Sequence, residues 1–77
     1  MPKLPRGIQR QRVMKAFRRA GWEIRPTKRG TKHTVMVKEG VEGILSIPRH
    51  NTIKVGTLDR LLETAGLTVE EFLSLLK

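Results

Sequence analysis

Apolar residues recur at helical spacing near the start of the chain, over residues 9–20. Positions three, four and seven apart share one face of an α-helix. The apolar face would consist of Val13, Ala16, Phe17 and Ala20. Most basic side chains of this segment fall on other faces, so the pattern predicts a basic amphipathic helix. Gly21 is expected to end it, because glycine readily takes the left-handed backbone conformation that closes many helices.

Three later segments have the residue types of β-strands. In residues 22–25 apolar and charged residues alternate, and Pro26 indicates an edge strand or the end of one. Residues 34–38 and 43–47 are β-branched and apolar, and the segment between them predicts a tight turn. We therefore expect a three-stranded antiparallel sheet that contains a hairpin.

The register of this hairpin decides which polar side chains meet. Centring the turn between Val41 and Glu42 places His33 opposite His50. Opposed residues in an antiparallel pair have Cβ atoms about 4.5 to 5.5 Å apart. A slip of one residue would break this pairing, and Pro48 favours an early end to the ladder.

Which face of the first hairpin strand is buried stays open at this point. A strand that is regular from its start puts His33 on the same face as Val35 and Val37. The valines favour burial of that face, in which case His33 would precede the strand. The opposite face would carry Thr34 and Met36.

Two short helices are expected after the hairpin. Thr57 is the predicted N-cap of the first, and Gly66 ends it. Its apolar stripe consists of Leu58, Leu61, Leu62 and Ala65. The motif Thr68-Val69-Glu70-Glu71 predicts a capping box at the start of the second, with Leu67 placed to pack on Phe72.

The order of these elements indicates an α+β fold of the α-β-β-β-α-α type, with the helices on one face of the sheet. A chain of 77 residues has room for one domain, 1–77, and one modest core. Cysteine is absent from the sequence, which excludes disulfides, thiolate metal sites and cysteine nucleophiles. Phe17 and Trp22 are expected in the core.

Positive charge is concentrated at the start of the chain. Residues 1–32 hold eleven of the sixteen Lys and Arg against one acid, Glu23, and so carry +10, whereas the rest carries −1. Clustered cations favour a polyanionic partner, because binding a phosphate backbone releases counterions. The sequence has no apolar run of about 18 residues, and residues 1–5 lack the apolar core of a signal peptide. We expect a cytoplasmic protein that does not bind a membrane.

The strongest candidate chemistry lies in Gly30-Thr31-Lys32-His33. A titratable imidazole beside fixed positive charge suits acid–base catalysis on a phosphodiester. From these residues alone, His33 is either catalytic or a contact to a nucleic-acid backbone, and His50 is either a site residue or a turn histidine. The sequence shows no zinc or magnesium ligand spacing and no glycine-rich phosphate loop.

Several landmarks occur in a characteristic order over residues 13–77. They are Gly21-Trp22, Gly30 followed by His33, Ile47-Pro48-Arg49-His50, Gly56-Thr57-Leu58, and Ala65-Gly66-Leu67-Thr68 before Glu71-Phe72. In this order and spacing the chain resembles the HicA toxins of bacterial and archaeal HicA/HicB toxin–antitoxin modules. The resemblance implies a double-stranded-RNA-binding-domain-like fold, a type II toxin that cleaves messenger RNA without a metal or other cofactor, and neutralisation by a HicB-type antitoxin.

The same resemblance implies a catalytic histidine at the start of the second strand, which is His33 here. The family commonly has one residue between glycine and histidine, whereas Thr31 and Lys32 both follow Gly30 in this chain. We assign the role to His33 because a lysine ammonium stays protonated at neutral pH and is a poor proton acceptor.

Cleaving RNA without a metal uses the ribose 2′-hydroxyl as the nucleophile. An imidazole can remove its proton at neutral pH, which contributes on the order of 10²- to 10⁴-fold in rate. His33 would be this base, and His50 the acid if the predicted register holds. Cations would stabilise the phosphorane or bind RNA along the first helix. These cations are Lys28, Arg29, Lys32, Arg12, Lys15, Arg18 and Arg19.

Two other functions fit parts of the pattern. A noncatalytic RNA-binding module would use the same basic helix, with His33 as a backbone contact. A DNA-reading helix-turn-helix over residues 57–76 is disfavoured, because Glu70 and Glu71 would put negative charge at the recognition helix. For a toxin, we expect a monomer when alone and an acidic antitoxin surface that covers His33 and the basic helix.

Overall fold

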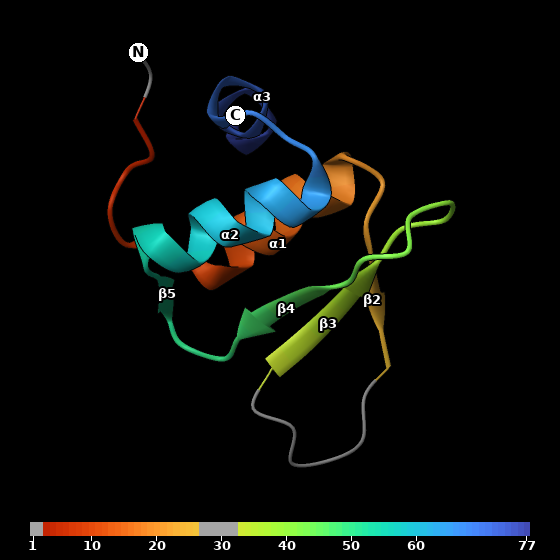
Figure 1. Ribbon diagram of the computed structural model, residues 1–77. Coiled ribbons are helices and arrows are strands. Elements are labelled where there is room, and N and C mark those ends of the chain that lie inside the picture. The colour runs from red at the N-terminus through yellow and green to blue at the C-terminus, as the bar shows by residue number, and fades with distance from the viewer. Residues whose placement is uncertain (1–2, 27–32) are drawn as a thin grey trace.

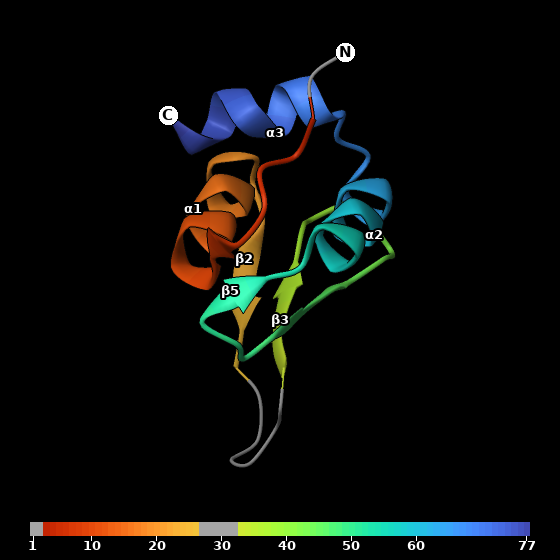
Figure 2. The ribbon, with the colours of Figure 1, turned by 90° about the vertical axis from the view of Figure 1, so that its left-hand side faces the viewer.

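The computed structural model describes residues 3–26 and 33–77 (Figure 1). Its helices are α1 (Arg10–Arg19), α2 (Val55–Ala65) and α3 (Val69–Leu76). Its strands are β1 (Ile8–Gln9), β2 (Glu23–Arg25), β3 (His33–Val37), β4 (Leu45–Pro48) and β5 (Thr52–Ile53). The helices lie on one side of the β2-β3-β4 sheet, as the turned view in Figure 2 shows. The predicted α+β class and antiparallel three-stranded sheet are confirmed.

A second, two-stranded sheet was not predicted. β1 pairs antiparallel with β5, so that Ile8 lies opposite Ile53 and Gln9 opposite Thr52. Both isoleucines are buried in the core. Strands of two residues are too short to show the alternation by which strands are recognised in a sequence. This ladder ties the segment before α1 to the segment before α2.

The predicted hairpin register is wrong by two residues. In the structure His33 lies opposite Pro48, and Thr34 opposite Ile47. The connection between the strands, residues 38–44, is longer than predicted, and its turn forms early, where the Val41 N–H donates to the Lys38 carbonyl at 3.1 Å. Gly40 takes φ 82° inside this turn, a conformation that glycine adopts without a steric cost.

The structure shows which face of β3 is buried. Thr34 and Met36 are buried beneath the helices, whereas Val35 and Val37 are half-buried on the other face. On the buried side, the facing residues Leu45 and Ile47 of β4 complete a continuous apolar surface. A two-residue shift in register keeps every side chain on its own face, so this packing does not depend on the register error.

The helix ends follow the predicted signals at every point but one. Gly66 closes α2 in the left-handed conformation, with φ 72°. Thr68 and Glu71 form the predicted capping box, in which the Glu71 N–H donates to the Thr68 hydroxyl and the Thr68 N–H to the Glu71 carboxylate, both at 3.1 Å. Thr57, however, is not an N-cap. The helix already begins at Val55, because β5 carries the chain directly to it.

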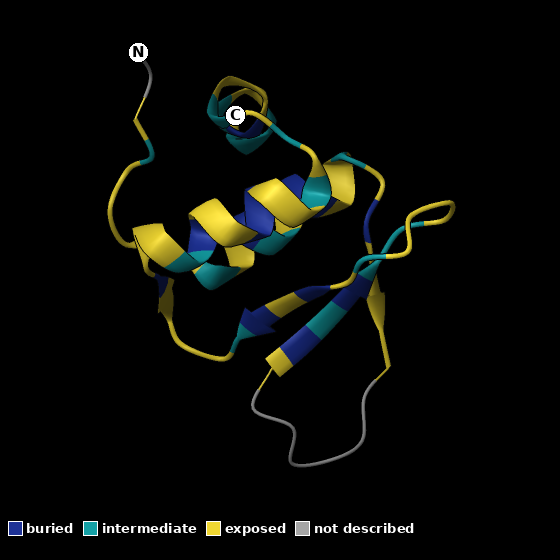
Figure 3. Ribbon diagram, in the orientation of Figure 1, coloured by how far each residue is buried: buried dark blue, intermediate teal, exposed yellow. Residues whose placement is uncertain are grey.

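The core lies between the sheet and the helices (Figure 3). Phe17 of α1 and Phe72 of α3 pack with their ring centroids 5.6 Å apart. Trp22 is also fully buried, so both predicted core aromatics are confirmed. Gly21, at φ 99°, ends the turn after α1 and lets the Trp22 N–H reach the Phe17 carbonyl at 3.0 Å. Across the described residues, no helix is long and apolar enough to cross a membrane.

Replacing Phe72 with alanine should lower the free energy of unfolding by about 3–5 kcal/mol, because it leaves a cavity beside Phe17. Chemical denaturation monitored by circular dichroism measures this change. The matched control is Ser74→Ala on the exposed side of α3, which should stay within about 0.5 kcal/mol of the parent. A Phe72→Ala loss no larger than that of the control would contradict the proposed packing.

Candidate functional site

His33 is the first residue of β3 and is exposed. It belongs to the sheet face that the helices do not cover, together with Val35. Its partner across the ladder is Pro48, the last residue of β4. The imidazole therefore stands at the end of the sheet, where a bound molecule can reach it without any change in the core.

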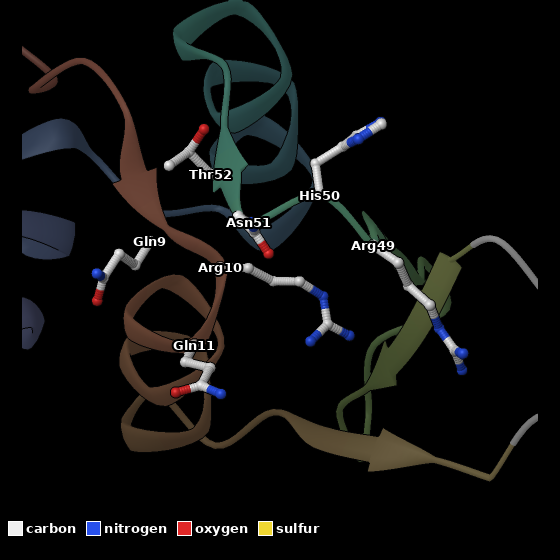
Figure 4. Close-up of a pocket in the computed structure, with 7 residues that line it drawn as sticks. All are labelled: Gln9, Arg10, Gln11, Arg49, His50, Asn51 and Thr52. Atoms are coloured by element: carbon white, nitrogen blue, oxygen red, sulfur yellow. The ribbon is translucent and has the colours of Figure 1, made fainter.

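The structure does not bring the two histidines together as predicted. His50 lies two residues beyond Pro48, in the connection between β4 and β5. The predicted pairing fails because the hairpin turn is centred one residue earlier than expected. His50 is exposed and borders a recess of about 400 Å³ together with Pro48. In Figure 4 its imidazole points away from Arg10.

Arg10, which the sequence did not single out, crosses from the helices to the sheet. Its backbone N–H donates to the Asn51 carbonyl at 2.9 Å. Its guanidinium donates through Nη2 to the hydroxyl of Thr34, the residue after His33. The Nε–H is buried and has no hydrogen-bond partner among the described residues. The side chain is thus held in place from both ends, with its Nε buried and the residue as a whole half-buried.

Arg10 lines an open hollow of about 600 Å³ beside the sheet (Figure 4). Its lining residues are Gln9, Arg10, Gln11, Arg49, His50, Asn51 and Thr52. Within this lining the side chains are cationic, amide, hydroxyl or imidazole, and none is acidic. Figure 4 shows Arg10 and Arg49 extending in the same general direction from two different segments. Such a lining suits an anion.

Sequence reasoning missed this hollow because its residues come from two distant segments. They meet through the β1–β5 ladder and the Arg10–Asn51 hydrogen bond, neither of which leaves a periodic signal. The sequence singled out Arg49 only as part of the motif Ile47-Pro48-Arg49-His50, with no role of its own. A cation between a strand end and a histidine is the one local sign that could have drawn attention to it.

The predicted cations of α1 separate into two groups. Arg12, Lys15 and Arg18 are exposed. Arg19 is exposed too, but it donates through Nη1 to the Leu75 carbonyl at 2.8 Å and to the Lys77 carbonyl. A cation at this end of α3 satisfies carbonyls that lack helical partners and complements the helix dipole. Lys28, Arg29 and Lys32 lie outside the described residues.

The family described as the HicA toxin of bacterial toxin–antitoxin matches residues 10–67 of the 77. This range includes β2, β3 and β4, the hollow's Arg10 and Arg49, and both histidines. No match was found among the curated proteins.

Replacing Thr34 with valine should destabilise the protein by about 1–3 kcal/mol, because it removes the acceptor of a half-buried guanidinium at nearly constant volume. Thr34→Ser keeps the hydroxyl and should retain more of the stability. Denaturant titration of both variants measures the difference. Equal stability of Thr34→Val and the parent would show that the Arg10 contact is unimportant for the fold.

Proposed function

Because this chain belongs to the HicA toxin family, we propose that it is the toxin of a type II toxin–antitoxin system and a metal-independent endoribonuclease that cleaves messenger RNA. The observation that supports this most directly is His33. It is exposed at the first residue of β3, the position at which the family resemblance expects the catalytic histidine. Its substrate and its antitoxin would place its action in the cytoplasm.

The proposed reaction uses the RNA as its own nucleophile. His33 removes the proton of the ribose 2′-hydroxyl, whose oxygen attacks the adjacent phosphorus. The bond to the 5′-oxygen of the next nucleotide breaks, and that oxygen takes up a proton from a water molecule. The products are a 2′,3′-cyclic phosphate and a 5′-hydroxyl. A correctly placed base contributes on the order of 10²- to 10⁴-fold in rate.

Positive charge supports this chemistry in two ways. Lys28, Arg29 and Lys32 precede His33 in the sequence, and we assign them the stabilisation of charge on the phosphorane oxygens. Arg12 and Lys15 are exposed on α1 and would hold the RNA through its phosphates. Both roles are independent of base identity, so we expect little sequence preference.

The partner we propose is a HicB-type antitoxin with an acidic surface. The cations that hold RNA are also the groups that such a surface would engage, so one contact area would block both substrate and active site. Arg19 is less suited to this contact than its neighbours, because its guanidinium already binds the carbonyl oxygens at the end of α3.

His33→Ala should abolish cleavage of a labelled single-stranded RNA in the presence of EDTA while leaving RNA binding intact. The expected loss in rate is at least about 10²-fold, and the wild-type product should carry a 2′,3′-cyclic phosphate. His50→Ala, assayed beside it, should retain cleavage, because His50 does not lie opposite His33 in the ladder. Cleavage that survives in His33→Ala, or a product with a plain 3′-hydroxyl, would refute the mechanism. RNA binding without cleavage by the wild type would identify a noncatalytic binding module.

Lys15→Glu combined with Arg18→Glu should weaken antitoxin binding at least about tenfold, mainly by slowing association, because charge complementarity steers the encounter. Isothermal titration and stopped-flow association measure the two effects. Lys54→Glu combined with Arg60→Glu, exposed at the N-cap and on the side of α2, is the matched double charge reversal and should have a smaller effect. Equal effects of both reversals would point to a different contact surface.

A further inference from the structure

The hollow beside Arg10 has a feature that the proposed catalysis does not use. Arg10 is half-buried, yet its only hydrogen-bond partner from a side chain in the described structure is the neutral hydroxyl of Thr34. Its Nε–H is buried and unsatisfied. Burying a cation is costly unless an opposite charge or several hydrogen bonds compensate it. If Arg10 served only to tie the helices to the sheet, a neutral donor would do so at lower cost.

The rest of the lining adds donors without adding negative charge. Arg49 is exposed and extends from the β4–β5 connection in the same general direction as Arg10 (Figure 4). Asn51 lies between the two segments, and Gln9 and Gln11 also line the hollow. Guanidinium groups bind phosphate oxygens through two parallel N–H donors, which gives both strength and orientation. The hollow therefore has the chemistry of a phosphate site.

We propose that this hollow binds a phosphate of the RNA backbone close to the one that is cleaved, with Arg10 and Arg49 as its binding residues. The proposal rests on the function proposed above. Thr34 accepts the hydrogen bond of Arg10 and directly follows His33 in β3, so the phosphate site and the catalytic histidine share one strand end.

The two sites lie on opposite sides of that strand. Thr34 faces the helices and His33 faces away from them, because neighbouring residues of a strand project to opposite faces. An RNA that occupies both must pass around the end of the sheet, where β3 begins and β4 ends. A single strand can make this bend, whereas a stiff duplex cannot. The substrate class is therefore flexible single-stranded RNA.

The test measures RNA binding in the His33→Ala background, so that cleavage does not interfere. The variants Arg10→Gln and Arg49→Gln are compared with Arg60→Gln, whose exposed side chain on α2 does not line the hollow. Affinity for a labelled single-stranded RNA is measured between roughly 50 and 200 mM salt. Loss of one phosphate contact should reduce the slope of log affinity against log salt by about 0.7. Wild-type cleavage is measured in parallel.

The expected result is a reduced slope for both hollow variants and an unchanged slope for Arg60→Gln. Slopes equal to the parent's in Arg10→Gln and Arg49→Gln, or no RNA binding by the parent, would overturn the proposal. If Arg10→Gln does not fold, Arg49→Gln decides, since Arg49 is exposed.

The same experiment separates the phosphate site from the proposed endonuclease. Reduced slopes without cleavage by the wild type would support the phosphate site and refute the endonuclease. Cleavage by the wild type with unchanged slopes would support the endonuclease and refute the phosphate site. Equal affinity for a duplex of the same length would refute the single-strand assignment.

Discussion

The fold depends on one apolar layer between the sheet and the helices. A chain of 77 residues buries a limited share of its surface, and this chain places its whole aromatic content in that layer. Phe17, Trp22 and Phe72 are all essentially inaccessible. No Phe, Tyr or Trp ring is then left for stacking on bases, which elsewhere provides much of the affinity for single strands. The proposed recognition of RNA therefore relies mainly on charge and hydrogen bonding.

The apolar layer also determines where the polar functional side chains can lie. Only one face of the three-stranded sheet meets the helices, so the other face and the ends of the sheet are available for contacts. His33 stands at such an end on the uncovered face, and the Arg10 hollow opens beside it on the covered side. Arg10 connects the two by its bond to Thr34, at the margin of the apolar layer. The core and the proposed RNA contacts therefore meet along a single strand.

The sequence predicted the elements whose signals are local. The helical spacing of Val13, Ala16 and Phe17 was enough to place α1. The capping box of Thr68 and Glu71 placed α3, because both of its hydrogen bonds lie within one turn. The family resemblance also identified the end of the sheet at which His33 lies. These features require no knowledge of how distant segments meet.

Features that depend on tertiary contacts were missed or misplaced. The hairpin register depends on where the turn forms. The turn contains Gly40 at positive φ, and the ladder is centred one residue earlier than predicted. Thr57 has the right chemistry for a cap, but the β1–β5 ladder brings the chain into α2 before it. Arg10 was one basic residue among many until its partner was known. The hollow required two segments some forty residues apart to be placed side by side.

The exposure of His33 has an evolutionary consequence. Because the side chain of this proposed catalytic residue lies outside the buried layer, a single substitution there would remove the proposed activity and leave the fold and its basic surface unchanged. Selection against toxicity would then favour a point mutation that inactivates the protein over a change that removes the protein altogether. Catalytically inert copies that still occupy the antitoxin would be an accessible by-product of selection against toxicity.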